Sequence, residues 1–349
     1  MRHVPLTLAA LLFAPCALAQ SRPAPGDLSG VKTYLLTRLA DQKAGTARLK
    51  TAADRYYTLA KGADFDYARL ARTNAGAVRA ALQGARAGWS TASPRYEEVE
   101  GIVAGVESLS EFDLILDAGV SGAEGGEDVV PFDLRLSDGR TLARPGNLFG
   151  VNEGALWGTV KAFGTSARLD LDGDGRLGFG DTLPDAQVLK AAAGELDRQT
   201  AALVKAASTW TPTQADVFGA LVGNVPTVGP VFFDGWKTSR FVLGARSQRR
   251  DFVVISRLSD LVGNVASWQA MYAGLSPSVR ARNTALDRQI SAGLTDLRSF
   301  AARLARQEQS RRFTPEQADT LQAEGQNRAT AITGRLTQAA ALLGVEVQP

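Results

Sequence analysis

The sequence predicts an all-α protein made of two helical bundles, with a small inserted β-hairpin and an EF-hand-like calcium loop between the halves. Apolar residues recur at helical spacing along most of residues 31–343. Alternation of polar and apolar residues interrupts this pattern only near residues 129–144. At 349 residues the chain is long enough to form two domains, each with its own core.

Helix breaks and capping signals give the expected order of elements. A flexible lead-in covers residues 20–28, the N-terminal bundle residues 29–168, the calcium loop residues 169–184, and the C-terminal bundle residues 185–349. Ser93-Pro94 is typical of a helix start, so a helix is expected to end near Trp89 and another to begin near Arg95. The expected helices are residues 31–61, 67–89, 95–108, 148–163, 185–208, 213–221, 232–243, 252–275, 277–307 and 315–343.

The inserted hairpin is expected at about residues 129–144. Phe132, Leu134 and Leu136 alternate with polar residues, and Asp138-Gly139 is a two-residue turn signal. A single small hairpin within an otherwise helical protein follows from this pattern.

The first residues have the pattern of a cleaved signal peptide, residues 1–19. Basic residues at positions 2–3 precede an apolar run over 4–13, and an Ala-x-Ala site ends at Ala19. Cys16 follows Pro15, where a lipoprotein anchor would have a small residue, so simple secretion is favoured over lipid anchoring. No later stretch has the apolar length of a membrane span. The expected location is therefore secreted, periplasmic or at the cell envelope, without a transmembrane span.

Composition excludes several classes of function. The net charge of +3 is spread over interspersed acids and bases, which gives no support for a nucleic-acid partner. His3 is the only histidine and Cys16 the only cysteine, and both lie in the expected signal peptide. The mature chain therefore lacks the residues of Ser-His-Asp or Cys-His catalysis and of thiolate or imidazole metal sites. We expect a protein without catalysis that binds metal through oxygen atoms.

Residues 170–181 fit the calcium-loop template of acids at positions 1, 3, 5 and 12 and glycine at position 6. Ca²⁺ takes six to eight oxygen ligands, and alternate side chains of a tight loop point to one centre. Leu177 at position 8 is expected to pack into the core, and both flanks are expected to be helical. The alternative is an acidic surface turn that binds nothing. The expected Ca²⁺ ligands are Asp170, Asp172, Asp174, Asp181 and the backbone carbonyl of Arg176.

Three further segments, in the same order along the chain, resemble motifs of the imelysin-like superfamily. Residues 93–100 (SPRYEEVE) resemble its R-x-x-Y-E-x-[IV]-E helix, and residues 149–157 (FGVNEGALW) its F-H-x-x-E-x-x-L-W segment. Residues 256–264 (SRLSDLVGN) resemble its S-x-x-D-L-x-x-x-N pattern. The superfamily includes the EfeO/EfeM-type iron-uptake components and peptidase M75-like proteins. The resemblance implies a two-bundle, all-α envelope protein associated with iron uptake.

The resemblance also implies a metal site, in which the family uses His-x-x-Glu together with carboxylates of neighbouring helices. Gly150 occupies the histidine position here, while Glu153 keeps the glutamate. An oxygen-only site of Glu97, Glu100 and Glu153 would suit a hard ion such as Fe³⁺ or Ca²⁺. Glu97 and Glu100 are three residues apart on one helix face and can converge on one ligand. The alternative is a solvated face, or a carboxylate pair held by Arg95.

The expected function is therefore an imelysin-like metal-binding protein that contributes to iron uptake or envelope metal handling. The calcium loop would be structural, and an envelope iron-transport component would be the partner. The alternative is a non-catalytic structural or adhesive envelope protein whose ancestral metal site is lost. A metallopeptidase is poorly supported, because the mature chain has no histidine to help activate water.

Overall fold

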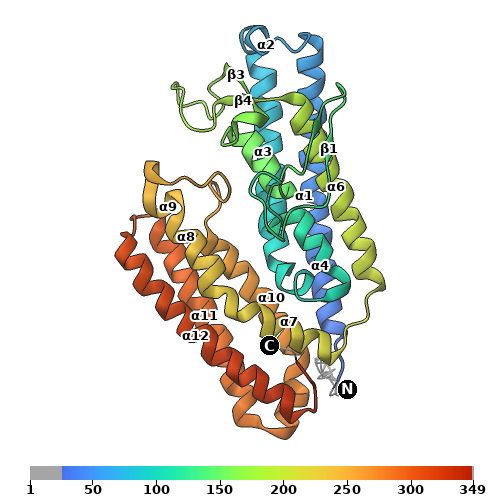
Figure 1. Ribbon diagram of the computed structural model, residues 1–349, viewed down its shortest axis with the longest axis vertical. Helices are drawn as coiled ribbons and strands as arrows, with labels where there is room; N and C mark the ends of the chain where they lie inside the picture. The colour runs from blue at the N-terminus through green and yellow to red at the C-terminus, as the bar shows by residue number, and fades with distance from the viewer. Residues whose placement is uncertain (1–25, 348–349) are drawn as a thin grey trace, which may run out of the picture.

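The structure, a computed structural model, describes residues 26–347. The signal peptide expected at residues 1–19, with Cys16, and most of the lead-in expected at residues 20–28 lie outside the described residues. The described chain is helical apart from two small two-stranded sheets, which confirms the predicted all-α fold class. Figure 1 shows two groups of long helices that lie beside each other at an angle.

Three long helices form the first bundle: α1 (Ser29–Gly62), α3 (Ala75–Val103) and α6 (Ala186–Thr209). α1 and α3 approach closely because glycines lie at their contact. A Cβ atom on Gly88 would lie 2.5 Å from the backbone nitrogen of Leu49, and one on Gly45 would lie 2.8 Å from that of Ala92. The apolar residues between them, including Leu49 and Tyr56, are fully buried.

The position of α6 corrects the expected domain boundary at residue 185. The ammonium group of Lys43 on α1 lies 2.7 Å from a carboxylate oxygen of Asp197 on α6. Farther along α1, the Tyr56 hydroxyl donates a hydrogen bond at 2.9 Å to the carbonyl of Pro184, which lies just before α6. The apolar face of α6 thus packs on α1, and the chain crosses to the second bundle only after Thr209, between α6 and α7.

The expected helix break at Ser93-Pro94 does not occur, and Pro94 lies inside α3. The preceding helix, α2 (Tyr67–Thr73), is short, and α4 (Glu107–Asp113) follows α3. α4 continues directly into a π-helical turn, η1 (Leu114–Ala118). Burial on both sides of the proline, at Ala92 and Tyr96, offsets the hydrogen bond that proline removes.

The hairpin is confirmed, as the antiparallel pair β1 (Leu134–Arg135) and β2 (Thr141–Leu142). Its turn contains Gly139 at φ +93°, in the left-handed region that glycine adopts readily. α5 (Leu148–Trp157) begins at the capping side chain of Asn147, which accepts a hydrogen bond from Gly150 N at 2.7 Å.

The flanks of the Asp-rich loop are strands, not the helices of an EF-hand. A 3-10 turn, η2 (Lys161–Phe163), leads into β3 (Gly164–Arg168), and β4 (Thr182–Pro184) follows the loop and pairs with β3 antiparallel. The loop therefore projects from the first bundle as the end of a β-ribbon (Figure 1).

The second bundle is formed by α7 to α12. α10 packs against both α11 and α3, and therefore joins the two bundles. The helix expected from residue 252 begins only at Arg257 and continues through Pro277. The elements are α7 (Gln214–Asn224), η3 (Val225–Val228), η4 (Gly229–Phe233), α8 (Asp234–Thr238), α9 (Arg240–Leu243), η5 (Gly244–Arg246), α10 (Arg257–Arg282), α11 (Thr284–Glu308) and α12 (Pro315–Leu342).

Within residues 26–347, one helical run, Gln214–Arg246, is long and apolar enough to cross a membrane by length and composition. Of its most apolar window, 56% is buried inside the protein. A core helix of a globular protein passes the same test, and this run packs against α10 and α12 in the second bundle.

Candidate metal centre

Five acidic side chains gather where α3 meets α10 and the turn formed by α4 and η1. We call them the carboxylate cluster, and all except Glu100 are at most 9% exposed. Each side chain projects from a helix, and its direction depends on how that helix packs. The contact between the two bundles therefore holds the cluster together. Its members are Glu97 and Glu100 on α3, Asp113 on α4, Asp117 on η1 and Asp260 on α10.

Three of these side chains lie close enough to share one ion. Glu97, Glu100 and Asp117 each offer an oxygen, and these oxygens all lie within 4.8 Å of one another. The amide group of Asn264 on α10 donates hydrogen bonds to both Glu97 and Glu100, at 2.9 Å for Glu97. The π-helical turn η1 contributes Asp117, and such turns are frequent at functional sites.

A single cation accompanies the carboxylate cluster. The guanidinium of Arg257 lies 3.1 Å from Asp260 and 3.9 Å from Glu97, and all three side chains are at most 5% exposed. Burial and the neighbouring carboxylates raise the pKa of Asp260 to about 6. Burial, reinforced by Glu100, raises the pKa of Asp113 to about 8, and the pKa values of Glu97 and Asp117 are well above the usual range for the same reasons. The single positive charge of Arg257 therefore cannot neutralise the negative charge that five ionised carboxyl groups would carry.

Asp117 accepts no hydrogen bond from the described residues although it is only 5% exposed. It lines a cavity of about 10 Å³, roughly the volume that one water requires, together with Asp260 and Glu153. A carboxylate that faces such a cavity without a donor from the protein is available to an ion or a water molecule. An oxygen-seeking ion at this position would supply the missing partner.

Glu153, expected as a third ligand beside Glu97 and Glu100, has its oxygens engaged elsewhere. They accept hydrogen bonds from three consecutive backbone N–H groups, at 2.8 Å from Phe252, 2.9 Å from Val253 and 3.0 Å from Val254. Burial raises the pKa of Glu153 to about 8, opposed by these three hydrogen bonds. The structure therefore brings Glu97 and Glu100 together with Asp117, and Glu153 forms part of the adjoining cavity wall.

The motif reasoning missed Asp113 and Asp117 as site residues. A sequence signal for them exists, because Phe112-Asp-Leu-Ile-Leu-Asp117 places two aspartates four residues apart within an apolar run. Such spacing puts both carboxylates on one buried face of a helix. Arg95, the suggested partner of the glutamates, binds Glu98 at 2.7 Å instead.

The Asp-rich loop brings its first three aspartates together at the surface. Oxygens of Asp170, Asp172 and Asp174 lie within 4.8 Å of one another. Asp181 is buried and accepts hydrogen bonds from Leu171 N and Gly178 N at 2.9 and 2.6 Å. The Arg176 N–H donates to Asp174 at 2.7 Å.

The loop is attached to the first bundle, and not placed in the chain connection between the bundles. Side chains of α3 reach its backbone: Arg79 Nε donates to the carbonyl of Asp170 at 2.8 Å, and Gln83 to that of Leu171 at 2.9 Å. Leu177, expected in the core, is 55% exposed, and Leu171 is the fully buried leucine. The loop meets the second bundle near its end, where the Arg240 guanidinium lies 3.8 Å from the centre of the Phe179 ring.

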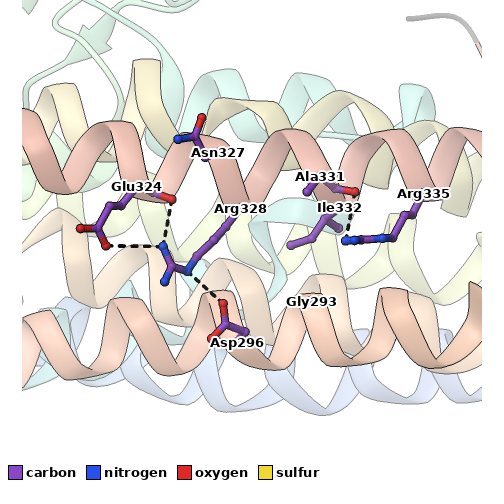
Figure 2. A pocket seen from close by; sticks show the side chains of 8 residues that line it. All are labelled: Gly293, Asp296, Glu324, Asn327, Arg328, Ala331, Ile332 and Arg335. Carbon is purple, nitrogen blue, oxygen red and sulfur yellow. Dashed lines mark hydrogen bonds and ion pairs between the residues drawn. The ribbon is translucent and has the colours of Figure 1, made fainter.

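A second hollow, between α11 and α12, is shown in Figure 2. Its charged groups neutralise one another, since Arg328 lies 2.9 Å from Asp296 and 3.6 Å from Glu324. The hollow is open to solvent, and its two carboxylates are both paired with Arg328, so we do not assign it a ligand.

The fold and the carboxylate cluster together define a two-bundle, all-α protein with an acidic centre at the contact between bundles. The chain belongs to the Imelysin (peptidase M75) family, whose model matches residues 35–343. It is also similar in fold to the crystal structure of a protein provisionally named iron-regulated protein A precursor, from Parabacteroides distasonis ATCC 8503. That match has a TM-score of 0.57 at 14% identity and covers 93% of this chain and 97% of the other. Among curated proteins, no match is found.

Proposed function

We propose that this protein binds a hard, multivalent cation at the carboxylate cluster and contributes to iron handling at the cell envelope. The observation that supports this most strongly is the gathering of five largely buried carboxyl groups around the single guanidinium of Arg257. Burying carboxylates without compensating charge is costly, because they lose the solvation that water provides. A bound cation offsets that cost, and Asp117, which receives no hydrogen bond within residues 26–347, has an oxygen within 4.8 Å of oxygens of Glu97 and Glu100.

The donor set indicates the class of ion. Carboxylate and amide oxygens suit hard ions such as Fe³⁺ or Ca²⁺, whereas softer metals favour imidazole and thiolate groups. Residues 4–349 contain no histidine, and Cys16 is their single cysteine. Iron is named because the Parabacteroides relative is called iron-regulated. Because residues 4–349 contain no histidine, the proposed role is binding without peptide hydrolysis, with delivery to an envelope transport partner.

Ion binding to the mature chain, from Gln20 onward, tests this proposal. With Fe³⁺ supplied as its nitrilotriacetate complex, we expect calorimetry to give binding that Asp117→Asn and Glu100→Gln each weaken at least about tenfold, the effect of losing one charged ligand contact. Glu346→Gln, at an exposed glutamate that follows α12 and is far from every member of the cluster in sequence, should bind like the wild type. Equal affinities for all four proteins would contradict the assignment of the site.

We propose a second ion, Ca²⁺, at the Asp-rich loop, where three carboxylates converge. Its role would be to order the loop against α3, since the loop backbone is held there by Arg79 and Gln83. Calorimetry with Ca²⁺ should show one site fewer in Asp170→Ala plus Asp174→Ala than in the wild type. Unchanged stoichiometry in that double variant would remove the calcium assignment.

The same two titrations distinguish the alternative function, a structural or adhesive envelope protein. That function predicts Ca²⁺ binding at the loop and no Fe³⁺ binding that depends on Asp117 or Glu100. Export by the signal peptide is part of both proposals, and N-terminal sequencing of the protein recovered from the cell envelope should begin at Gln20.

A further inference from the structure

Residues 247–256, which we call the strap, connect η5 to α10 without forming a helix. Three strap residues, Asp251, Phe252 and Ile255, line the small cavity beside Asp117 and Asp260. The strap belongs to the second bundle by sequence, yet its backbone is bound by side chains of the first. It therefore forms part of the cavity wall, next to Glu153 of α5.

Two side chains of the first half of the chain, Glu153 and Thr159, are hydrogen-bonded to the backbone of the strap. Glu153 on α5 accepts hydrogen bonds from the backbone N–H groups of Phe252, Val253 and Val254. Farther along the chain, the Thr159 hydroxyl donates to the carbonyl of Arg250 at 2.7 Å. Three successive N–H groups directed at one carboxylate form a concave anion-binding backbone, and here the anion is a side chain 99 to 101 residues away.

The backbone of the strap is strained at its centre. Phe252 has φ +49°, in the left-handed region that bulky side chains rarely adopt. Such a conformation persists only where the surroundings hold it, and it is common at switches and ligand clamps. The hydrogen bond from Phe252 N to Glu153 is one of the contacts that hold this residue.

The strap also contacts the cation of the carboxylate cluster. The guanidinium carbon of Arg257 lies 4.1 Å from the centre of the Phe252 ring and 4.7 Å from the centre of the Phe232 ring. Arg257 in turn reaches Asp260 and Glu97. Movement of Phe252 would therefore expose both the cavity and its counter-ion.

From this geometry we propose that the strap is a lid over the carboxylate cluster and that Glu153 is its latch, a positioning residue and not an ion ligand. The inference deepens the proposed function and rests on it for the identity of the occupant, a hard cation. Ions enter and leave when the hydrogen bonds to Glu153 break and the strap swings away from α5. The glutamate of the family's His-x-x-Glu segment thus controls access in this chain.

Amide hydrogen exchange and trypsin cleavage measure the latch directly. In Glu153→Gln, we expect exchange at Phe252, Val253 and Val254, and cleavage after Arg249 and Arg250, to accelerate by about tenfold or more, because the glutamine NH₂ group cannot accept a hydrogen bond and at least one of the three bonds is lost. Thr159→Val, which removes only the hydroxyl bound to Arg250, should accelerate the cleavage to a smaller extent. Unchanged protection of α3 and α10 in both variants shows that the fold is intact.

Ion release separates a latch from a ligand. Tb³⁺, a hard trivalent probe, is loaded into full-length mature protein that carries Asp170→Ala and Asp174→Ala, and its release to a chelator is followed by luminescence. Glu153→Gln should speed release about as much as it speeds amide exchange. Glu100→Gln should weaken Tb³⁺ binding while leaving the strap amides protected.

Two results would overturn the proposal. One is unchanged exchange at the three strap amides in Glu153→Gln. The other is weaker Tb³⁺ binding in that variant with the strap still protected, which would make Glu153 a ligand. If the unaltered cluster does not bind Tb³⁺ at all, the proposed function fails, while the exchange data still decide whether Glu153 holds the strap.

Discussion

At the scale of single residues, Asp113 shows how the carboxylate cluster affects stability. It accepts a hydrogen bond from the Tyr96 hydroxyl at 2.6 Å, and burial raises its pKa to about 8. In the unfolded chain the same group ionises near pH 4. Between these two values the folded chain holds more protons than the unfolded chain, so the free energy of unfolding falls as pH rises.

We therefore expect metal-free wild-type protein to lose stability from pH 5 to pH 8. Asp113→Asn keeps an acceptor for Tyr96 but cannot ionise, so its loss over this range should be smaller by on the order of 2 kcal/mol. Urea denaturation at pH 5, 6, 7 and 8 with a chelator present measures both proteins. Parallel stability curves for the two proteins would show that Asp113 is not the group responsible.

At the scale of elements, the helix bounds predicted from sequence are accurate where a helix buries a single apolar face. α1 and α12 begin and end within two residues of their expected bounds. The reading failed at Pro94 because packing on both sides of it stabilises a continuous α3. The helix start predicted at Phe252 was wrong for a different reason. The apolar run Phe252–Ile255 is typical of a helix, but the backbone N–H groups of its first three residues donate hydrogen bonds to Glu153.

The site was also only partly readable from sequence. The three-residue spacing of Glu97 and Glu100 on α3 indicated that their side chains lie close together, and their oxygens lie within 4.8 Å of each other. No local pattern indicates that Asp117 is their third neighbour, because its approach depends on how η1 packs against the rest of the first bundle. The loop template indicated that Asp170, Asp172 and Asp174 lie together, and their oxygens lie within 4.8 Å of one another. The template did not indicate the strands on either side, which depend on the pairing of β3 with β4.

At the scale of the whole molecule, the contact between α3 and α10 assembles the carboxylate cluster. Gly263 on α10 lies against Glu97: a Cβ there would lie 2.9 Å from the Glu97 Cβ and 3.2 Å from its carbonyl carbon. An added methyl group must push the two helices apart, because backbone cannot yield as a flexible side chain does.

Gly263→Ala should therefore weaken Fe³⁺ binding by about tenfold or more, since even small displacements of converging ligands remove contacts. The helical content should stay unchanged, because each bundle keeps its own core. Gly223→Ala on α7 is the matched control, since a Cβ at that glycine meets nothing within 4 Å. Calorimetry and circular dichroism measure the two properties, and equal affinities for both variants would contradict this role of the α3–α10 contact.

The long separation between the two sides of the carboxylate cluster has a consequence for biosynthesis. Asn264 and Glu97, joined by a hydrogen bond, are 167 residues apart in the chain. The helices of the first bundle are complete at Thr209, before any residue of α10 has been made. A nascent or unfolded chain thus has no assembled carboxylate cluster, so the ion that we propose would be loaded only after α10 has packed against α3.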